Sequence, residues 1–253
     1  MARKIFLFVW CCCCLMVSAQ EIRFMSYNVR NAKGMDDRTD FDRVARVIKE
    51  ACPDVVAVQE IDSVTRRSNG LFVLEEIGHR TGYSCSYAPA IDYQGGKYGI
   101  GILFKKKPQC VHYISLPGRE ERRALLVAEF KKYVVCVAHL SLTAEDRMAS
   151  LPLILEETSK INSDKPIFFA GDFNDEPDSD FINSLKQHFD ILSDIAKPTF
   201  PSDNPNVTID YICHLKRTGE HVAVKDYQVM AERMASDHRP ILATLNINNK
   251  HNK

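Results

Sequence analysis

The chain of 253 residues lacks the fingerprints of several common enzyme classes. It has no Gly-x-Gly-x-x-Gly motif and no Gly-x-x-x-x-Gly-Lys motif, which argues against a dinucleotide-binding enzyme and a P-loop nucleoside triphosphatase. No serine or cysteine motif indicates a protein nucleophile. Whatever chemistry the chain supports must therefore come from other polar side chains.

A surplus of basic residues is also missing. Lys and Arg together number 33, the same as Asp and Glu, whereas a dedicated nucleic-acid binder usually has a basic excess on one face. Only local clusters occur, at 66–67, 105–107 and 119–123, and we interpret the lysine run as solvated loop charge. A nucleic-acid partner stays open but is not favoured, and we expect a monomer.

Cysteine is sparse outside one run at positions 11–14. The others are Cys52, Cys85, Cys110, Cys136 and Cys213. Their odd number, wide spacing and lack of a Cys-x-x-Cys pair argue against a disulfide scaffold and against a zinc site. One disulfide stays possible on this pattern.

No apolar segment is long enough to cross a membrane. The longest, Ile5 to Val17, has 13 apolar residues, fewer than a bilayer requires. It follows Arg3 and Lys4 and precedes the small residues Ser18 and Ala19, a pattern typical of a secretory signal peptide. We predict a signal peptide over 1–19, a mature domain over 20–253, and an exported protein in the periplasm or outside the cell.

Strands and helices alternate along the rest of the chain, without a linker or repeat. Apolar residues spaced i, i+3, i+4, i+7 predict helices, and short apolar runs between turn residues predict strands. We predict helices at 40–51, 71–81, 142–161 and 179–189. We predict strands at 22–27, 55–58, 83–88, 99–105, 110–116, 124–138 with a break at 131–132, 167–170, 207–215, 222–230 and 241–247. The result is one mixed α/β domain with much antiparallel sheet.

Carboxylates, amides and imidazoles stand at the ends of these apolar runs. They are Asn28, Glu60, His139, Asp172, Asn174, Asp210, Asp237 and His238. Strand ends along one rim of a sheet are where an α/β protein gathers side chains from distant parts of the sequence. These side chains suit a hard cation and a phosphate and do not suit an apolar ligand.

Several short motifs resemble the endonuclease/exonuclease/phosphatase superfamily. They are Ser26-Tyr-Asn28, Val58-Gln-Glu60, Tyr98-Gly-Ile-Gly-Ile-Leu, His139-Leu, Gly171-Asp-Phe-Asn, Ile209-Asp210-Tyr and Ser236-Asp-His-x-Pro. They occur in the family's order and span almost the whole mature chain. The resemblance implies a four-layer α/β/β/α sandwich, in which two packed mixed sheets have helices outside and the site lies at the rim between them.

The resemblance also implies a metal site. Glu60 is the best candidate ligand, because a carboxylate that ends an apolar strand is costly to bury without a cation. Asp237 is the second expected carboxylate, and Asn28 supplies either an amide oxygen to the metal or an NH₂ group to the substrate phosphate. We expect Mg²⁺ as the cofactor, with Mn²⁺ or Ca²⁺ as alternatives.

The remaining residues are expected to carry catalysis. Asp210 should orient His238 and raise its proton affinity. Asp172 and His238 are rival candidates for the general base; we favour Asp172 orienting water and His238 stabilising the transition state. Asn174 would donate a hydrogen bond to that transition state. His139 is expected as a second catalytic histidine, and Arg123 is a weaker candidate for contacting substrate phosphate.

These residues predict an exported Mg²⁺-dependent phosphohydrolase that cleaves a phosphodiester or phosphomonoester by direct attack of water. Two alternatives stay open: a secreted nuclease on DNA or RNA, and a non-catalytic binding module on the same fold.

Overall fold

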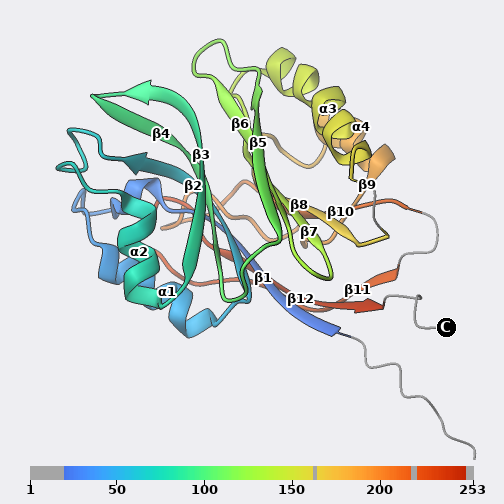
Figure 1. The fold of residues 1–253 in the computed structure, drawn as a ribbon, viewed down its shortest axis with the longest axis horizontal. Helices are drawn as coiled ribbons and strands as arrows, with labels where there is room; N and C mark the ends of the chain where they lie inside the picture. The colour runs from blue at the N-terminus through green and yellow to red at the C-terminus, as the bar shows by residue number, and fades with distance from the viewer. Residues whose placement is uncertain (1–19, 162–163, 218–220, 249–253) are drawn as a thin grey trace, which may run out of the picture.

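The computed structural model describes residues 20–161, 164–217 and 221–248; the predicted signal peptide at 1–19 lies outside the described residues. Two six-stranded sheets pack face to face, and helices cover the outer face of each (Figure 1). The predicted four-layer α/β/β/α sandwich is confirmed.

The first sheet has the strand order β11-β12-β1-β2-β4-β3. Its strands are β1 (Gln20–Asn28), β2 (Val55–Ser63), β3 (Ser84–Tyr93), β4 (Gly96–Phe104), β11 (His221–Val229) and β12 (Ile241–Asn248). The second sheet has the order β5-β6-β7-β8-β10-β9. Its strands are β5 (Cys110–Leu116), β6 (Arg123–Glu129), β7 (Val134–His139), β8 (Ile167–Asp172), β9 (Phe189–Ile191) and β10 (Asp210–Leu215).

Four α-helices form the outer layers. Helices α1 (Phe41–Ala51) and α2 (Val73–Thr81) cover the first sheet, and α3 (Ala144–Ser159) and α4 (Asp180–His188) cover the second. The helix α1 begins where the Asp40 side chain accepts a hydrogen bond from the Arg43 amide at 2.9 Å, and it ends at Cys52, which is left-handed. None of the helices in the described part of the chain combines the length and apolarity that crossing a bilayer requires.

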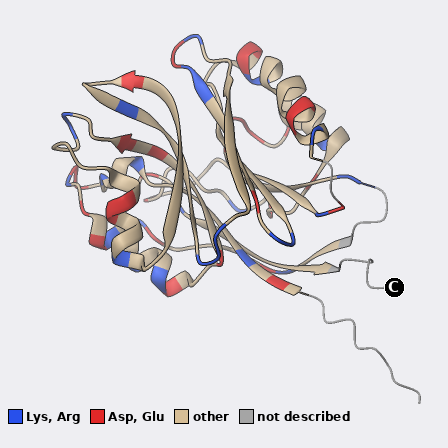
Figure 2. Cartoon of the chain, in the orientation of Figure 1, with Lys and Arg blue, Asp and Glu red and all other residues tan. Residues whose placement is uncertain are grey.

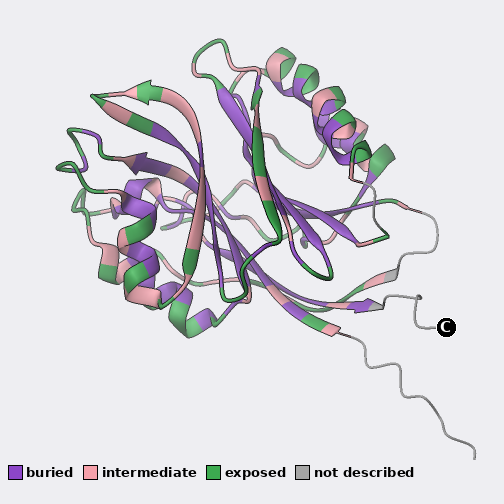
Figure 3. Cartoon of the chain, in the orientation of Figure 1, coloured by how far each residue is buried: buried purple, intermediate pink, exposed green. Residues whose placement is uncertain are grey.

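Apolar side chains fill the space between the two sheets and between each sheet and its helices. Figure 3 shows the inner strands almost entirely buried, with exposure confined to outer helix faces, edge strands and loops. Charged residues are distributed accordingly, mostly on helices and connections (Figure 2). All five cysteines of the described chain are free thiols.

Each sheet contains one parallel pair of strands at its centre, and the remaining pairs are antiparallel. The parallel pairs are β1 with β2, connected through α1, and β7 with β8, connected through α3. The carboxyl ends of a parallel pair lie at the same edge of their sheet. Asn28, at the end of β1, therefore lies beside Gln59 of β2. His139, at the end of β7, lies beside Asp172 at the end of β8.

Several predicted boundaries differ from the structure because isolated backbone bridges hold the flanking residues extended. The helix predicted from 71 begins at Val73, since Phe72 forms a bridge with Ser63. The strand predicted from 207 begins at Asp210, because Val207 instead bridges Phe200. The strand β9, with three residues, was not predicted.

Candidate functional site

The predicted polar residues converge at one rim of the sandwich. Asp210 begins β10, which runs antiparallel to β8, so Asp210 lies opposite Asp172 in the sheet. His238 stands just before β12, which runs antiparallel to β1 and so begins where β1 ends at Asn28. The two sheets thus contribute to one group of side chains.

Asp172 lies at the centre of this group. Its Oδ2 accepts a hydrogen bond from Asn28 Nδ2 at 3.0 Å. The same oxygen lies 3.5 Å from the Nε2 atoms of both His139 and His238. Its Oδ1 accepts a hydrogen bond from the backbone N–H of Asn174 at 2.9 Å. These contacts bring Asn28 and His238 of the first sheet together with His139 and Asp172 of the second.

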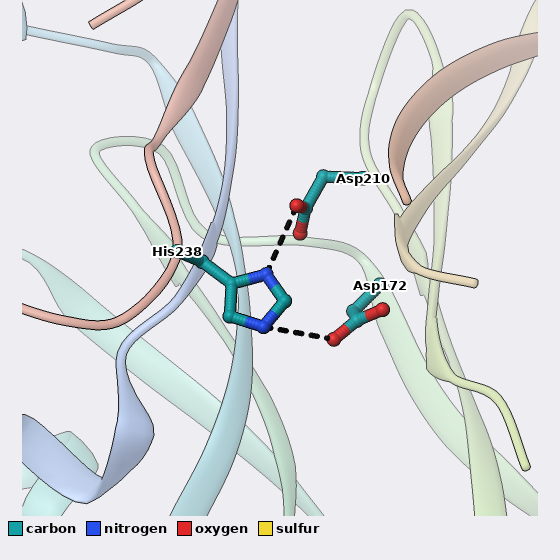
Figure 4. A group of neighbouring side chains, drawn as sticks. All are labelled: Asp172, Asp210 and His238. Carbon is teal, nitrogen blue, oxygen red and sulfur yellow. Dashed lines mark hydrogen bonds and ion pairs between the residues drawn. The ribbon is translucent and has the colours of Figure 1, made fainter. Parts of the chain in front are cut away.

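His238 lies between two carboxylates, with its ring nitrogens facing Asp210 and Asp172 (Figure 4). The Nδ1–Asp210 Oδ2 distance is 3.0 Å. Burial by itself lowers the pKa of His238, but Asp210 and Asp172 outweigh it and raise that pKa to about 10. His238 is therefore an imidazolium at neutral pH, able to donate a proton or a charged hydrogen bond.

The ionisation of Asp172 and His139 follows from burial. Burial raises the pKa of Asp172 to about 7, assisted by the neighbouring Asp210 and opposed by His238. Burial, followed by Arg123 and His238, lowers the pKa of His139 well below its usual value. At neutral pH the site thus combines a charged histidine, a neutral histidine and a carboxyl group close to its own pKa.

Glu60 reaches the site through a bulge in β2. Val58 pairs with Gly101 of β4 and Ile61 pairs with Gly99, so two residues of β2, Gln59 and Glu60, oppose one residue of β4. Because of the extra residue, the side chains of Ile61 and Val58 both lie in the core between this sheet and helices α1 and α2. Glu60 adopts a φ of 59°. A bulge of this kind re-aims a side chain, often beside an active site.

The bulge brings Glu60 into contact with Asn28. Asn28 Nδ2 donates to Glu60 Oε1 at 3.0 Å, while Asn28 Oδ1 accepts a hydrogen bond from the Arg30 amide at 3.0 Å. In this orientation the NH₂ group of Asn28 faces the carboxylate of Glu60 and its side-chain oxygen faces the backbone of Arg30.

The surroundings of Glu60 fit a divalent cation. Burial raises the pKa of Glu60, the Asn28 hydrogen bond opposes this shift, and the carboxylate of Asp237 adds to it. Among the described residues, no Lys or Arg forms an ion pair with Glu60. A half-buried carboxylate beside a second acid, without a basic partner, is stabilised by a hard cation.

A second group also has metal-ligand chemistry. Ligand atoms of Asp172, Asp210 and His238 lie within 4.8 Å of one another. Because both nitrogens of His238 face carboxylates, a cation there would displace the hydrogen bond to Asp210. The Glu60 side of the site fits a cation better, since within the described part of the chain Glu60 accepts a hydrogen bond only at Oε1 and its Oε2 has none to lose.

Hydrogen bonds from two side chains to backbone carbonyls hold the loops that carry these residues. Ser236 Oγ donates to the carbonyl oxygen of Asn28 at 2.7 Å, which fixes the His238 loop to the end of β1. Asn174 adopts a left-handed φ of 50°, and its Nδ2 donates to the Leu140 carbonyl at 2.9 Å. Asn174 therefore joins the loops that follow β7 and β8, in addition to its contact with Asp172.

Arg123 is located differently from the expectation for a substrate contact. Its side chain is buried and forms ion pairs with Glu120 at 3.4 Å and Glu121 at 3.0 Å. Neither glutamate was predicted, because the basic residues at 119–123 alone indicated a cluster of positive charge. Their position immediately before the inner strand β6 was the available signal.

Comparison with known proteins gives the same fold. Residues 25–238 match the model of the Endonuclease/Exonuclease/phosphatase family. No curated protein sequence matches the chain significantly.

Three solved structures illustrate the similarity, and at these identities they show the fold alone. An endonuclease/exonuclease/phosphatase from Bacteroides vulgatus is 21% identical with a TM-score of 0.74, covering 90% of this chain and 99% of its own. The mannosyl-6-phosphatase of Bacteroides thetaiotaomicron is 18% identical with a TM-score of 0.68, covering 88% and 99%. The D. rerio TDP2 complexed with a single-strand DNA product is 20% identical with a TM-score of 0.69, covering 89% and 99%. Because the family model spans most of the sequence, this chain belongs to the endonuclease/exonuclease/phosphatase family.

Proposed function

We propose that the protein is an exported, Mg²⁺-dependent phosphohydrolase that cleaves a phosphoester by direct attack of water. The observation that carries the proposal is the position of Asp172, between charged His238 and Asn28, with the half-buried carboxylate of Glu60 on the other side of Asn28. One group of side chains then offers a proton acceptor, a cationic donor and a cation-binding carboxylate, which are the groups that phosphoryl transfer to water requires.

The roles follow from the ionisation of each group. Asp172, with its pKa raised to about 7, accepts the proton of the attacking water. The imidazolium of His238, held by Asp210, donates a hydrogen bond to a phosphoryl oxygen and stabilises the charge of the transition state. Neutral His139 donates a further hydrogen bond on the same side, and the Asn28 NH₂ group positions the carboxylates of Glu60 and Asp172. Asn174 holds the Asp172 carboxylate in place.

A divalent cation would be held by Glu60 and Asp237, with Asn28 beside them. When bound, it supplies positive charge to a phosphoryl oxygen and so reduces the repulsion of the nucleophile. Mg²⁺ suits oxygen ligands of this kind, and Mn²⁺ and Ca²⁺ are the alternatives to compare.

The proposal of export rests on the sequence at 1–19, where a basic start precedes a short apolar segment and small residues. Expression of the full chain in a bacterial host, followed by cell fractionation and mass spectrometry of the amino terminus, tests it. We expect processed protein outside the cytoplasm, with an amino terminus near Gln20. Unprocessed protein in the cytoplasm would contradict export and leave the enzymatic proposal standing.

The enzymatic proposal is tested with an aryl phosphomonoester and an aryl phosphodiester, with Mg²⁺ and with EDTA. Glu60→Ala and His238→Ala should each reduce kcat by at least about 100-fold. The matched controls Glu50→Ala and His79→Ala change exposed residues on α1 and α2 and should keep full activity. Activity that survives EDTA would remove the metal from the proposal.

Thermal unfolding separates an enzyme from a binding module. Mg²⁺ should raise the Tm of the wild type and leave that of Glu60→Ala unchanged, because ligand binding stabilises only a state with an intact site. A Tm shift without turnover of any phosphoester would favour the non-catalytic binding module. The nuclease alternative predicts that an oligonucleotide is the best substrate.

A further inference from the structure

The loops that follow β7 and β8 begin at His139 and Asp172, where the parallel ladder between the two strands ends. One more backbone hydrogen bond follows, from the Leu140 N–H to the Asp172 carbonyl oxygen at 2.9 Å. Beyond it the two segments diverge, one into α3 and the other towards α4. The distance of 3.5 Å between His139 Nε2 and Asp172 Oδ2 therefore depends on what holds the two loops together.

Arg147, near the start of α3, bridges these two loops. Its Nη1 donates to the Ser141 carbonyl oxygen at 3.0 Å, and Ser141 lies two residues after His139. Its Nε donates to Asp175 Oδ2 at 2.8 Å, and Asp175 lies three residues after Asp172. Because a planar guanidinium presents both donors in a fixed geometry, it holds the two acceptors at a set distance from each other.

The bridge is buried. The side chains of Arg147 and Asp175 are only 9% and 12% exposed. At this burial, salt and water screen the ion pair weakly, and removal of one partner leaves the other charge uncompensated. The contact is therefore stronger and better ordered than an exposed ion pair, in which both side chains are free to move.

Asp175 is also held by the neighbouring strand β10. The hydroxyl of the buried Tyr211 donates to the Asp175 carbonyl oxygen at 2.8 Å. Tyr211 directly follows Asp210, and β10 pairs with β8 in an antiparallel ladder. Arg147 thus joins the loops after β7 and β8 to the strand that begins with Asp210.

We propose that Arg147 is a positioning residue, which sets the spacing of His139 and Asp172 through its bridge from Ser141 to Asp175. Within the described chain its side chain forms no hydrogen bond or ion pair with His139 or Asp172, so it acts through the two loops. This inference rests on the proposed phosphohydrolase function, because that proposal gives His139 and Asp172 their roles.

The first test measures hydrolysis of phenyl phosphate with Mg²⁺ by the wild type and Arg147→Ala. We expect kcat to fall about 100-fold while KM changes less than about twofold, because the reacting groups remain but are displaced. Guanidinium ion should raise the kcat of Arg147→Ala about tenfold, since it can refill the bridge, whereas methylammonium should not.

Arg147→Lys serves as a second variant in case Arg147→Ala does not fold. It keeps a positive charge beside Asp175, so the protein should stay folded. Its kcat should still fall about tenfold, because an ammonium group lacks the planar pair of donors that spans both acceptors.

Hydrogen exchange reports on the same bridge without turnover. The N–H groups of Leu140 and Asn174 both donate to Asp172. In Arg147→Ala and Arg147→Lys they should exchange faster relative to the N–H groups in the centres of β7 and β8, because the loops open locally. A general loss of stability would leave this exchange ratio unchanged.

Two control variants separate positioning from stability. Ile154→Ala removes a fully buried side chain from the same helix and should lower the Tm, while kcat and the exchange ratio stay unchanged. Arg119→Ala removes an exposed arginine that also pairs with an aspartate of α3, Asp146, and should leave kcat and the exchange ratio unchanged.

The outcomes separate this inference from the proposed function. Wild-type kcat in the Arg147 variants would overturn the inference, and so would an equal loss of kcat in Ile154→Ala or a failure of guanidinium to restore activity. A wild type that hydrolyses no phosphoester would overturn the proposed function. In that case an unchanged exchange ratio in Arg147→Lys would overturn the inference independently, and an increased ratio would support it.

Discussion

Gly171 is the position where the fold of the site is most sensitive to one added atom. It precedes Asp172 in β8 and pairs with Ala138 in the parallel ladder. Its φ of 151° is rare for residues with a side chain. A Cβ atom at this position would stand 1.8 Å from the Ala138 carbonyl oxygen, which belongs to the backbone and cannot rotate away.

The size of the effect of Gly171→Ala follows from that contact. Cβ atoms essentially never approach within 3.0 Å, so β7 and β8 must separate by about 1.2 Å, the difference between 3.0 and 1.8 Å. Backbone strain and steric overlap together should cost about 3 to 5 kcal/mol of unfolding free energy. A displacement of about 1 Å at the catalytic groups reduces turnover by about 100-fold, and His139 and Asp172 end the two displaced strands.

Urea unfolding and Mg²⁺-dependent hydrolysis of an aryl phosphate measure the two effects. The control is Gly70→Ala, because Gly70 also has a positive φ, of 74°, but an added Cβ would meet no atom within 4 Å. That control should cost about 1 kcal/mol and leave kcat unchanged. Equal stability of the two variants, or wild-type kcat for Gly171→Ala, would refute the steric reasoning.

Further predictions concern ionisable and polar side chains. Asp210→Asn removes the charge that holds the pKa of His238 at about 10; kcat at neutral pH should fall about 100-fold, and a histidine titration by NMR should show the pKa moving towards 6.5. An unchanged His238 titration would contradict the pairing. The Glu120 pKa is lowered to about 2 because hydrogen bonds from Ser141, its own backbone and Leu142 outweigh the effect of burial. Its stabilisation is therefore present above the ordinary value of 4.5 and is lost as the pH falls from 4.5 towards 2. Because the group is partly exposed, Glu120→Gln should cost only about 1 kcal/mol near neutral pH, with a shallower acid dependence in urea titrations; parallel pH curves would argue against it. Asn174→Ala should lower kcat about tenfold with a smaller effect on KM, since it removes the Nδ2 hydrogen bond to the Leu140 carbonyl that joins the loops after β7 and β8, while the backbone hydrogen bond to Asp172 remains; a change in KM alone would place Asn174 at the substrate.

Local patterns in the sequence were sufficient for most of the secondary structure. Apolar periodicity located α1 and the inner strands, because burial on one or both faces imposes it directly. It failed where a backbone bridge across a short loop holds a residue extended, as between Phe72 and Ser63 and between Val207 and Phe200. The β3–β4 hairpin is also longer than predicted, since Pro89 interrupts the strand pattern before the turn at Gln94 and Gly95.

The sequence by itself determined which functional groups this protein can bring to a phosphate: carboxylates, amides and histidines at the ends of apolar strands. Only the tertiary structure decided how they meet and which ones are charged. The bulge that turns Glu60 towards Asn28 and the two carboxylates that keep His238 protonated depend on neighbours from other strands or loops. Ionisation and hydrogen bonding are set by distances and burial, and the folded chain establishes both through contacts that no local run of residues specifies.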